Sequence, residues 1–507
     1  MTAIDPARTV SVVGTGTMGQ GIAQVALLAG HPVRLYDAAP GRAAEAGRGI
    51  AARLDRLVDK GRLDAARRDA ALERLRPAED PAELADSALV IEAILEQLDA
   101  KQKLFVRLES VVGDDCLLAT NTSSLSVTAV GGALRLPGRL VGLHFFNPAP
   151  LLPLVEVVRG HATDRAAADR ARATVAAWGK TPVSCADTPG FIVNRIARPF
   201  YAEAFRVHEE GAADPATIDA VLRESGGFAM GPFELTDLIG QDVNNAVTRS
   251  VHEAFFHDPK FRPSLAQQRL VEAGLLGRKS GRGWFDHAEG ADRPRPHTAE
   301  PCAAPDAVGR HGRLPANADV LWAMIEEAGI KVVHDRAPAG RDGFISLPGG
   351  TELALADGSG ATSGAHRSPR ITFDLALDYR GCARVALAAS ETVPEADLKA
   401  ATGLFQALGK KVSVIGDVPG MIVARTVAML ADFAEDAVGR GVASGEDTDT
   451  AMRLGVNYPM GPLEWGRAVT YGWVRLVLRN LDDEYPGGRY AACQPLRRRA
   501  AVEESLL

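Results

Sequence analysis

The feature that most constrains the fold of this chain is a glycine-rich turn at residues 14–19, with the sequence GTGTMG. It follows a β-branched run at 9–13, which has the pattern of a strand buried on both faces. An apolar stretch with helical spacing comes next, at 20–29, and a second apolar run at 33–36 ends in Asp37. A strand, a glycine turn, a helix, a strand and an acid in this order predict a Rossmann-type dinucleotide-binding unit.

The residues of this turn have separate tasks in such a unit. Gly14 permits the tight turn, Gly16 lets the backbone approach a pyrophosphate at the helix N-terminus, and Gly19 allows close packing of helix against strand. Asp37 is placed to bond the adenosine ribose hydroxyls and to repel a 2′-phosphate, so the predicted cofactor is NAD rather than NADP. A glycine turn without a ligand is the alternative, and the order of the elements argues against it.

A histidine and a carboxylate stand inside two apolar runs further along the chain: His144 in the sequence LHFFNP and Glu156 in LVEVV. A histidine titrates near neutrality, and a carboxylate beside it would orient the ring and favour its protonated form. The pair therefore indicates a general base, with a buried core histidine as the alternative. Predicted strands at 117–120 and 140–143 end in the polar run 121–124 and in His144, at the sheet edge where open α/β sheets bind ligands.

Composition sets outer limits on the class of protein. A length of 507 residues suggests about three domains, and 46% hydrophobic with 24% charged residues is typical of a soluble globular protein. The net charge of −7 argues against nucleic-acid binding. Five scattered cysteines without a C-x-x-C pair predict neither a disulfide framework nor a metal site. With no signal peptide and no apolar run near the ~18 residues of a membrane helix, the prediction is a cytoplasmic protein.

Two stretches outside the sheet have a helical character. Residues 41–76 read as one long charged helical excursion, whose cations form either a solvated face or a basic rim for an anionic, phosphate-bearing substrate. From 191 to 275 the chain is helical throughout, with stops at Gly211 and 226–227. A nucleotide-binding unit followed by a helical domain suits a dehydrogenase whose substrate lies in the cleft between them.

The second half contains an internal repeat. Residues 417–425 copy 187–195 at a constant offset of 230, but the position of Asn194 is Ala424 in the copy, and no glycine turn precedes it. The helical domain is therefore duplicated without its site. The predicted organisation is a Rossmann domain at 1–186, a helical substrate and dimerisation domain at 187–287, a linker at 288–312, a degenerate Rossmann-like or small α/β unit at 313–411, and a second, non-catalytic helical domain at 412–507.

Six motifs in the same order resemble the 3-hydroxyacyl-CoA dehydrogenase family, including its 3-hydroxybutyryl-CoA members. The resemblance covers residues 9–287. The motifs lie at 14–19, 121–125, 144–148, 187–195, 230–234 and 278–285.

Carried over residue by residue, the resemblance implies His144 as the base on the 3-hydroxyl and Glu156 as its partner. Ser123 and Asn194 would bond the oxygens of the substrate. The implied cofactor-binding residues are Gly14, Gly16, Met18, Gly19, Asp37, Glu96, Lys101, Asn147 and Lys279. The implied CoA contacts are Arg53, Lys60 and Ser123, and position 53 departs from the family because it is Arg rather than Lys.

The implied activity is NAD-dependent oxidation of an (S)-3-hydroxyacyl-CoA in fatty-acid or phenylacetate catabolism. The duplicated architecture is also similar to the dehydrogenases that act on 3-hydroxyadipyl-CoA, so this substrate and 3-hydroxybutyryl-CoA both remain open. Two rivals are a dehydrogenase of a free 3-hydroxy acid and a non-catalytic, crystallin-like NAD-binding protein. The second helical domain is expected to make the chain either an internal pseudo-dimer or a homodimer, with a leftover tail as the alternative.

Overall fold

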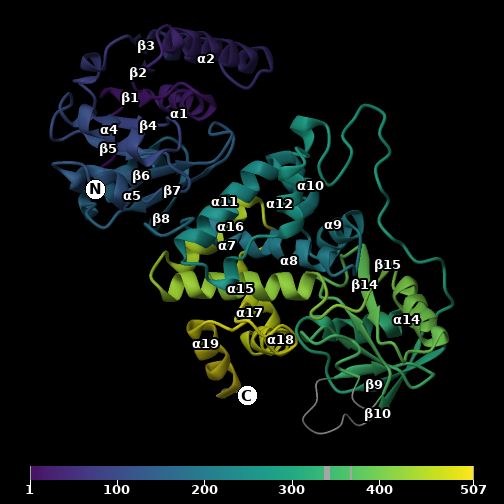
Figure 1. Ribbon diagram of the computed structural model, residues 1–507. Helices are drawn as coiled ribbons and strands as arrows, with labels where there is room; N and C mark the ends of the chain where they lie inside the picture. Colours follow the sequence, from purple (N-terminus) through teal and green to yellow (C-terminus); the bar gives the residue numbers. More distant parts are fainter. Residues whose placement is uncertain (1, 336–342, 366–367, 506–507) are drawn as a thin grey trace. The chain divides into compact units, whose positions relative to one another are not determined.

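The computed structural model (Figure 1) describes residues 2–335, 343–365 and 368–505. Positions 336–342 and 366–367 of the predicted unit 313–411 therefore lie outside the described residues. The chain forms two compact units, one from 1–195 with 440–456 and the other from 196–439 with 457–507. The predicted fold class is confirmed: an N-terminal Rossmann-type sheet, helical domains and a second, smaller sheet unit. In the described part of the chain, no helix is long and apolar enough to cross a membrane.

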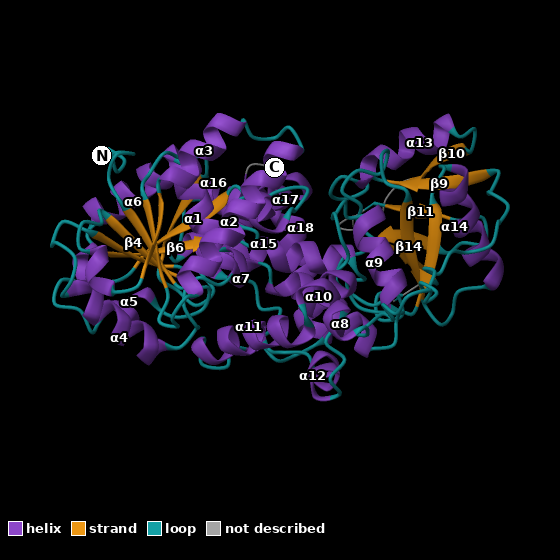
Figure 2. Cartoon of the chain, turned by 90° about the horizontal axis from the view of Figure 1, so that it is seen from above, coloured by secondary structure: helices purple, strands orange, loops and turns teal. Residues whose placement is uncertain are grey.

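The first unit is built on an eight-stranded sheet with the order β3-β2-β1-β4-β5-β6-β7-β8. All neighbours are parallel except β6 and β7. Figure 2 shows helices on both faces of this sheet. The strands are β1 (Val10–Val13), β2 (Val33–Tyr36), β3 (Leu75–Ala78), β4 (Leu89–Glu92), β5 (Leu117–Thr120), β6 (Leu140–Phe145), β7 (Leu154–Arg159) and β8 (Thr181–Ala186). The helices are α1 (Thr17–Leu28), α2 (Arg42–Asp59), α3 (Ala65–Glu73), α4 (Leu98–Glu109), α5 (Val127–Gly131), α6 (Arg165–Ala177) and α16 (Gly445–Val456).

The glycine turn joins β1 to α1 with little room for side chains. Gly14 has φ +94°, and a Cβ on Gly19 would lie 1.8 Å from the carbonyl oxygen of Gly14. Gly19 therefore permits the close approach of α1 to the strand. A Cβ on Gly16 would meet no atom within 4 Å, so the backbone there borders open space.

The stretch 41–76 differs from the prediction of one helical excursion. α2 ends before Gly61, which has φ +65° and breaks the helix, and Asp64 then caps α3 by accepting from the Ala66 amide. The end of the stretch belongs to β3. Charged residues on both sides of the break conceal it in the sequence pattern.

The second unit contains a seven-stranded mixed sheet with the order β10-β9-β11-β12-β13-β14-β15. β9, the first of these strands along the chain, lies within the predicted linker 288–312, so the predicted linker was too long. Only one side chain of this strand, Val308, is fully buried, which leaves no alternation to detect. The strands are β9 (Ala307–His311), β10 (Lys331–Asp335), β11 (Phe344–Ser346), β12 (Glu352–Leu355), β13 (Arg370–Phe373), β14 (Arg384–Ala389) and β15 (Lys411–Ile415).

The last part of this sheet repeats the first sheet. β13, β14 and β15 stand at an offset of 230 from β6, β7 and β8, and α14 (Glu395–Ala407) stands at the same offset from α6. Both pairs, β6 with β7 and β13 with β14, are antiparallel and keep the same register. In that register Asp374 occupies the position of His144, and Ala386 that of Glu156. The duplication thus extends beyond the helical domain into the sheet.

The helices of the second unit include two equivalent ones that pack on each other, α8 and α15. Glu203 of α8 is fully buried and binds Arg425 of α15 at 3.0 Å, and it also binds Arg489. Burial alone would raise the pKa of Glu203, but the two guanidinium groups lower it to about 2. The helices are α8 (Arg198–Glu209), α9 (Pro215–Glu224), α10 (Pro232–Ile239), α11 (Gln241–Ala254), α12 (Leu265–Glu272), α13 (Leu321–Glu327), α15 (Val423–Gly439), α17 (Pro462–Val469), α18 (Tyr471–Glu484) and α19 (Gln494–Ser505), and the short α7 (Val193–Ile196) lies at the boundary of the units.

Each helical copy supplies a helix to the sheet of the other copy. In the first unit α16, from the second copy, packs on β7 and β8, and the Ala186 amide donates to the Val442 carbonyl at 2.7 Å. In the second unit α9, from the first copy, packs on β14, and the Gly416 amide donates to the Ala212 carbonyl at 2.8 Å. The two contacts are related by the offset of 230 residues, so the two halves of the chain pack crosswise.

Candidate active site

His144 and Glu156 are brought together by the antiparallel pairing of β6 with β7. They are direct cross-strand partners, and His144 Nδ1 lies 2.5 Å from Glu156 Oε2. His144 is 6% exposed and Glu156 is fully buried. The rings of Phe146 and Phe191 lie 4.4 Å and 5.8 Å from the imidazole. The carboxylate therefore holds Nδ1 of the ring within an apolar enclosure.

The second oxygen of Glu156 has a structural task. Oε1 accepts from the amides of Ile192 and Val193 at 3.0 Å and 2.9 Å, and so fixes the segment that follows β8. In the second copy Asp374 accepts from the equivalent amides, Ile422 and Val423, at 3.1 Å and 2.8 Å. Burial raises the pKa of Asp374 to about 6, although these amide bonds oppose the shift. The copy keeps the capping carboxylate and lacks the imidazole.

The other two predicted catalytic residues form a second contacting pair in the same unit. Asn194 Nδ2 donates to the Ser123 carbonyl at 3.4 Å, which joins the end of β5 to the segment after β8. Asn121, which the sequence analysis did not single out as a site residue, accepts from the Phe145 amide at 2.9 Å. It ties the end of β5 to the strand that carries His144. Its place in the polar run after β5 was the available signal.

The dinucleotide turn meets the requirements of NAD. Asp37 accepts from the Thr15 amide and hydroxyl at 3.0 Å and 2.7 Å, and from the Ala39 amide. Burial would raise the pKa of Asp37, but these bonds lower it, so the group stays charged at the end of β2. The open space at Gly16, at the start of α1, leaves room for a pyrophosphate.

Comparison with known proteins identifies the family. The sequence matches the model of the 3-hydroxyacyl-CoA dehydrogenase NAD binding domain at 9–188 and that of the C-terminal domain at 190–287 and 420–505. The chain belongs to the 3-hydroxyacyl-CoA dehydrogenase family. Residues 353–419 match the reduced Rossmann-fold domain of 3-hydroxybutyryl-CoA dehydrogenase. The resemblance predicted from the six motifs is thereby confirmed, and with it NAD as the cofactor.

Individual relatives cover the chain to different extents. A 3-hydroxyadipyl-CoA dehydrogenase of Escherichia coli K12 is 43% identical over 505 residues, which is 98% of each chain. A crystal structure of an E. coli K12 3-hydroxybutyryl-CoA dehydrogenase matches with a TM-score of 0.89 at 42% identity, over 99% of this chain and 100% of that one. A probable 3-hydroxybutyryl-CoA dehydrogenase of Deinococcus radiodurans is 40% identical over 54% of this chain and 99% of its own. The chain is an NAD-dependent 3-hydroxyacyl-CoA dehydrogenase with a duplicated second half.

The remaining residues predicted to hold the cofactor differ in burial and in their hydrogen-bond and ion-pair partners. Met18 lies on α1 and packs against the core, and Asn147 is exposed after β6. Lys101 is 1% exposed and pairs with Glu92, while Glu96 lies in the loop before α4. Lys279 belongs to the other unit, where it pairs with Asp242 at 2.5 Å.

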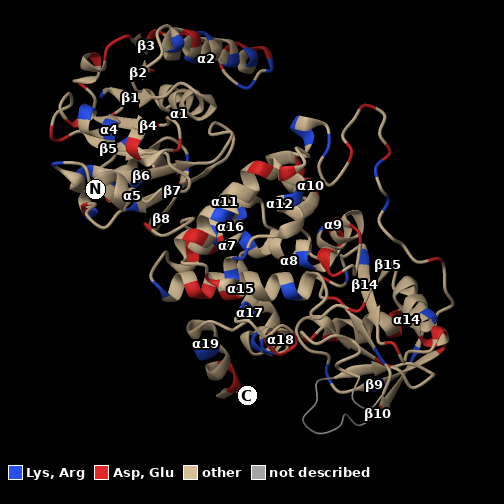
Figure 3. Ribbon diagram, in the orientation of Figure 1, with Lys and Arg blue, Asp and Glu red and all other residues tan. Residues whose placement is uncertain are grey.

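Arg53 and Lys60 line a pocket of about 400 Å³ beside α1 and α2. Arg56 and Arg62, which were not predicted as contacts, line it too, and Figure 3 shows the Lys and Arg residues of α2. Arg53 is held by Gln20 at 2.9 Å, and its buried Nη2 has no hydrogen-bond partner among the described residues. Burial and the charge of Arg56 lower the pKa of Arg53. Four cations around one pocket fit an anionic ligand better than a solvated face.

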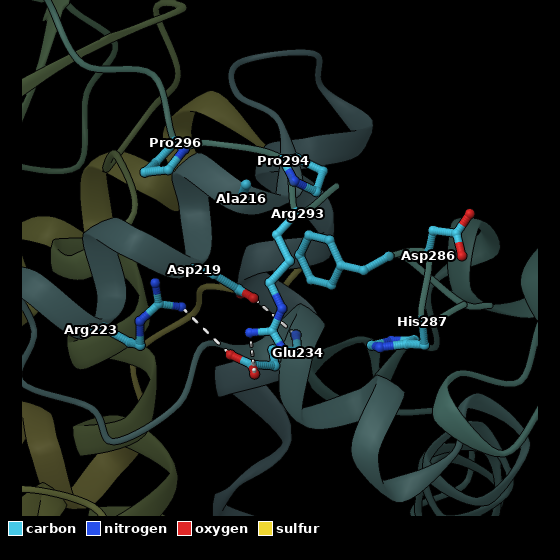
Figure 4. A pocket seen from close by; sticks show the side chains of 10 residues that line it. Ala216, Asp219, Arg223, Glu234, Asp286, His287, Arg293, Pro294 and Pro296 are labelled. Atoms are coloured by element: carbon cyan, nitrogen blue, oxygen red, sulfur yellow. Dashed lines mark hydrogen bonds and ion pairs between the residues drawn. The ribbon is translucent and has the colours of Figure 1, made fainter. Parts of the chain in front are cut away.

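A second charged pocket lies in the helical domain between α9 and α10 (Figure 4). Asp219 accepts there from the Phe233 and Glu234 amides at 3.0 Å and 2.9 Å, and burial raises its pKa to about 7. Arg223 and Arg293 face Glu234. The second copy repeats the acid, the arginine and the glutamate as Asp449, Arg453 and Glu464. This pocket therefore belongs to the helical fold rather than to the catalytic site.

Substitutions of Glu156 can separate the roles of its two carboxylate oxygens. In Glu156→Gln an amide oxygen can still accept from the Ile192 and Val193 amides, so we expect the free energy of unfolding to change by less than about 1 kcal/mol, while kcat falls at least about tenfold. Glu156→Ala leaves two buried amides without an acceptor and should cost a further ~1–3 kcal/mol. Denaturant unfolding and steady-state kinetics measure both.

Asp374→Asn is the matched control in the second copy, and we expect it to leave kcat unchanged. Equal destabilisation by Glu156→Gln and Glu156→Ala would contradict the structural task assigned to Oε1.

Proposed function

We propose that His144 is the general base of an (S)-3-hydroxyacyl-CoA dehydrogenase and that Glu156 orients it. The supporting observation is the 2.5 Å contact between Nδ1 and a fully buried carboxylate. Nε2 takes the proton of the 3-hydroxyl group as the hydride leaves C3, which gives a 3-oxoacyl-CoA. Bound NAD supplies the hydride acceptor. Glu156 stabilises the imidazolium that forms, and the apolar rings around it exclude water.

The remaining roles follow from position. Ser123 and Asn194, which already contact each other, would bond the substrate oxygens and hold C3 in line for transfer. Asn147 would lie against the nicotinamide end of the cofactor. Arg53 and Lys60 would bind the CoA phosphates, and Arg56 and Arg62 would add to the same positive pocket.

Replacement of the base tests the central role. We expect His144→Gln to bind NADH with unchanged affinity and to lower kcat at least about a hundredfold, because no group is left to take the hydroxyl proton. Fluorescence titration of NADH and steady-state kinetics measure the two effects. A variant with near-wild-type kcat would refute the assignment.

For the acyl group we propose 3-hydroxyadipyl-CoA ahead of 3-hydroxybutyryl-CoA. The support is the relative of that name, which is 43% identical over 98% of both chains. The E. coli crystal structure that carries the 3-hydroxybutyryl-CoA name covers 99% of this chain, so coverage does not separate the two substrates and their relative rates must. 3-Hydroxyadipyl-CoA would place the enzyme in phenylacetate catabolism, and the shorter substrate in fatty-acid catabolism.

Relative rates decide between these substrates. We expect kcat/KM to be at least about tenfold higher for 3-hydroxyadipyl-CoA than for 3-hydroxybutyryl-CoA, because a site that binds the terminal carboxylate loses that contact with the shorter substrate. Free 3-hydroxybutyrate should give no NADH. Equal kcat/KM values would refute the preference, and turnover of the free acid would refute the thioester assignment.

We further propose that the second half makes the chain an internal pseudo-dimer. The crosswise packing of α16 on β7 and β8, and of α9 on β14, is the relation expected of two exchanged copies. The buried pairing of Glu203 with Arg425 joins α8 of one copy to α15 of the other. A half chain would lose these contacts and expose apolar surface on both elements.

A fragment of residues 1–287 tests this proposal. We expect it to self-associate into dimers or larger species, since β7 and β8 lose α16, whereas the intact chain keeps its own oligomeric state. Size exclusion with light scattering measures the mass of the fragment and of the intact chain. The control is the full chain cleaved once within 290–305, with its two pieces kept together. A soluble, active fragment with the oligomeric state of the intact chain would contradict the proposal.

The state of the cysteines indicates the cellular compartment of the protein. All five are free, and four of them are buried. Free thiols in this number suit a reducing environment, so we propose a cytoplasmic location.

A further inference from the structure

Three charged side chains, two of them buried, form a connected relay next to the turn that carries Ser123. Glu92, at the C-terminal end of β4, is fully buried, and Lys101 on α4 is 1% exposed. Lys101 Nζ lies 2.5 Å from Glu92 Oε1 and 3.2 Å from Glu96 Oε2. The ammonium group therefore bridges two carboxylates, one inside the sheet and one at its edge.

Glu96 holds the Ser123 turn directly. Its Oε1 accepts from the Ser123 and Ser124 amides at 2.9 Å and 3.1 Å, and from the Thr122 hydroxyl at 2.5 Å. Burial would raise the pKa of Glu96, but the charge of Lys101 and the bonds from the turn lower it. One oxygen of this carboxylate binds the turn while the other faces Lys101.

Glu92, at the inner end of the relay, is held by hydrogen bonds to both of its carboxylate oxygens. Glu92 is the cross-strand partner of Thr120, whose hydroxyl donates to Glu92 Oε2 at 2.7 Å, and the Ile94 amide donates to Oε1 at 2.7 Å. A buried ion pair adds little stability over a well-packed apolar pair, so its presence needs another reason. Its geometry supplies one, because it connects the sheet to the turn that presents Ser123.

We propose that Glu92 is a positioning residue that holds Ser123 in place through Lys101 and Glu96. The inference rests on the proposed role of Ser123 in bonding the substrate.

A double-mutant cycle in the full-length enzyme tests the relay. We expect Glu92→Gln to lower kcat/KM for 3-hydroxybutyryl-CoA at least about tenfold, since small displacements of a positioning group carry large penalties. In a Ser123→Ala background the same change should lower kcat/KM by less than about twofold.

Glu109→Gln is the matched control, because Glu109 is a largely buried carboxylate of the same unit that pairs with Arg139 away from the turn. It should leave kcat/KM unchanged. If Glu92→Gln fails to fold, Thr120→Val removes one bond to Glu92 with almost no change of shape and should show the same non-additivity with Ser123→Ala.

The outcomes separate the inference from the function on which it rests. Fully additive effects, or a wild-type Glu92→Gln beside an impaired Ser123→Ala, overturn the relay alone. Wild-type kinetics in Ser123→Ala would instead refute the proposed role of Ser123 itself.

Discussion

The buried carboxylate of Glu156 is the interaction on which the site depends. One oxygen fixes the imidazole of His144, and the other accepts two amides of the segment that follows β8. Both contacts need the antiparallel register of β6 and β7, because a slip of one residue would send the side chains to opposite faces of the sheet. A buried charge with all its bonds satisfied therefore ties the base to the segment that carries Asn194.

The duplication separates the two tasks of this carboxylate. The second sheet keeps the register of β13 and β14, but Asp374 replaces the histidine and Ala386 replaces the glutamate. Asp374 still accepts the amides at the start of the following helix. Each half thus places one carboxylate against these amides, Glu156 in the first half and Asp374 from the neighbouring strand in the second, whereas only the first half has the imidazole. The crosswise exchange of α9 and α16 gives the second half a structural task, since each sheet packs against a helix from the other copy.

Local patterns predicted the parts of the fold that short-range physics controls. The glycine turn, the pairing of His144 with Glu156 and the repeat from 187 were visible because each depends on residue type at a fixed spacing. The prediction of one helix over 41–76 was wrong, because Gly61 and Asp64 end one helix and start another within a charged stretch. β9 was assigned to the linker because its order comes from pairing with two distant strands.

The sequence by itself determined the nucleotide-binding fold, the cofactor and the identity of the candidate base, since a phosphate-binding turn and a titratable pair leave a local signature. Only the tertiary structure decided which groups serve them. Lys101, which the resemblance implies as a cofactor contact, is also a buried bridge between Glu92 and Glu96, and four basic residues of one charged stretch converge on a single pocket. Burial and convergence are properties of packing between distant segments, and no spacing along the chain records them.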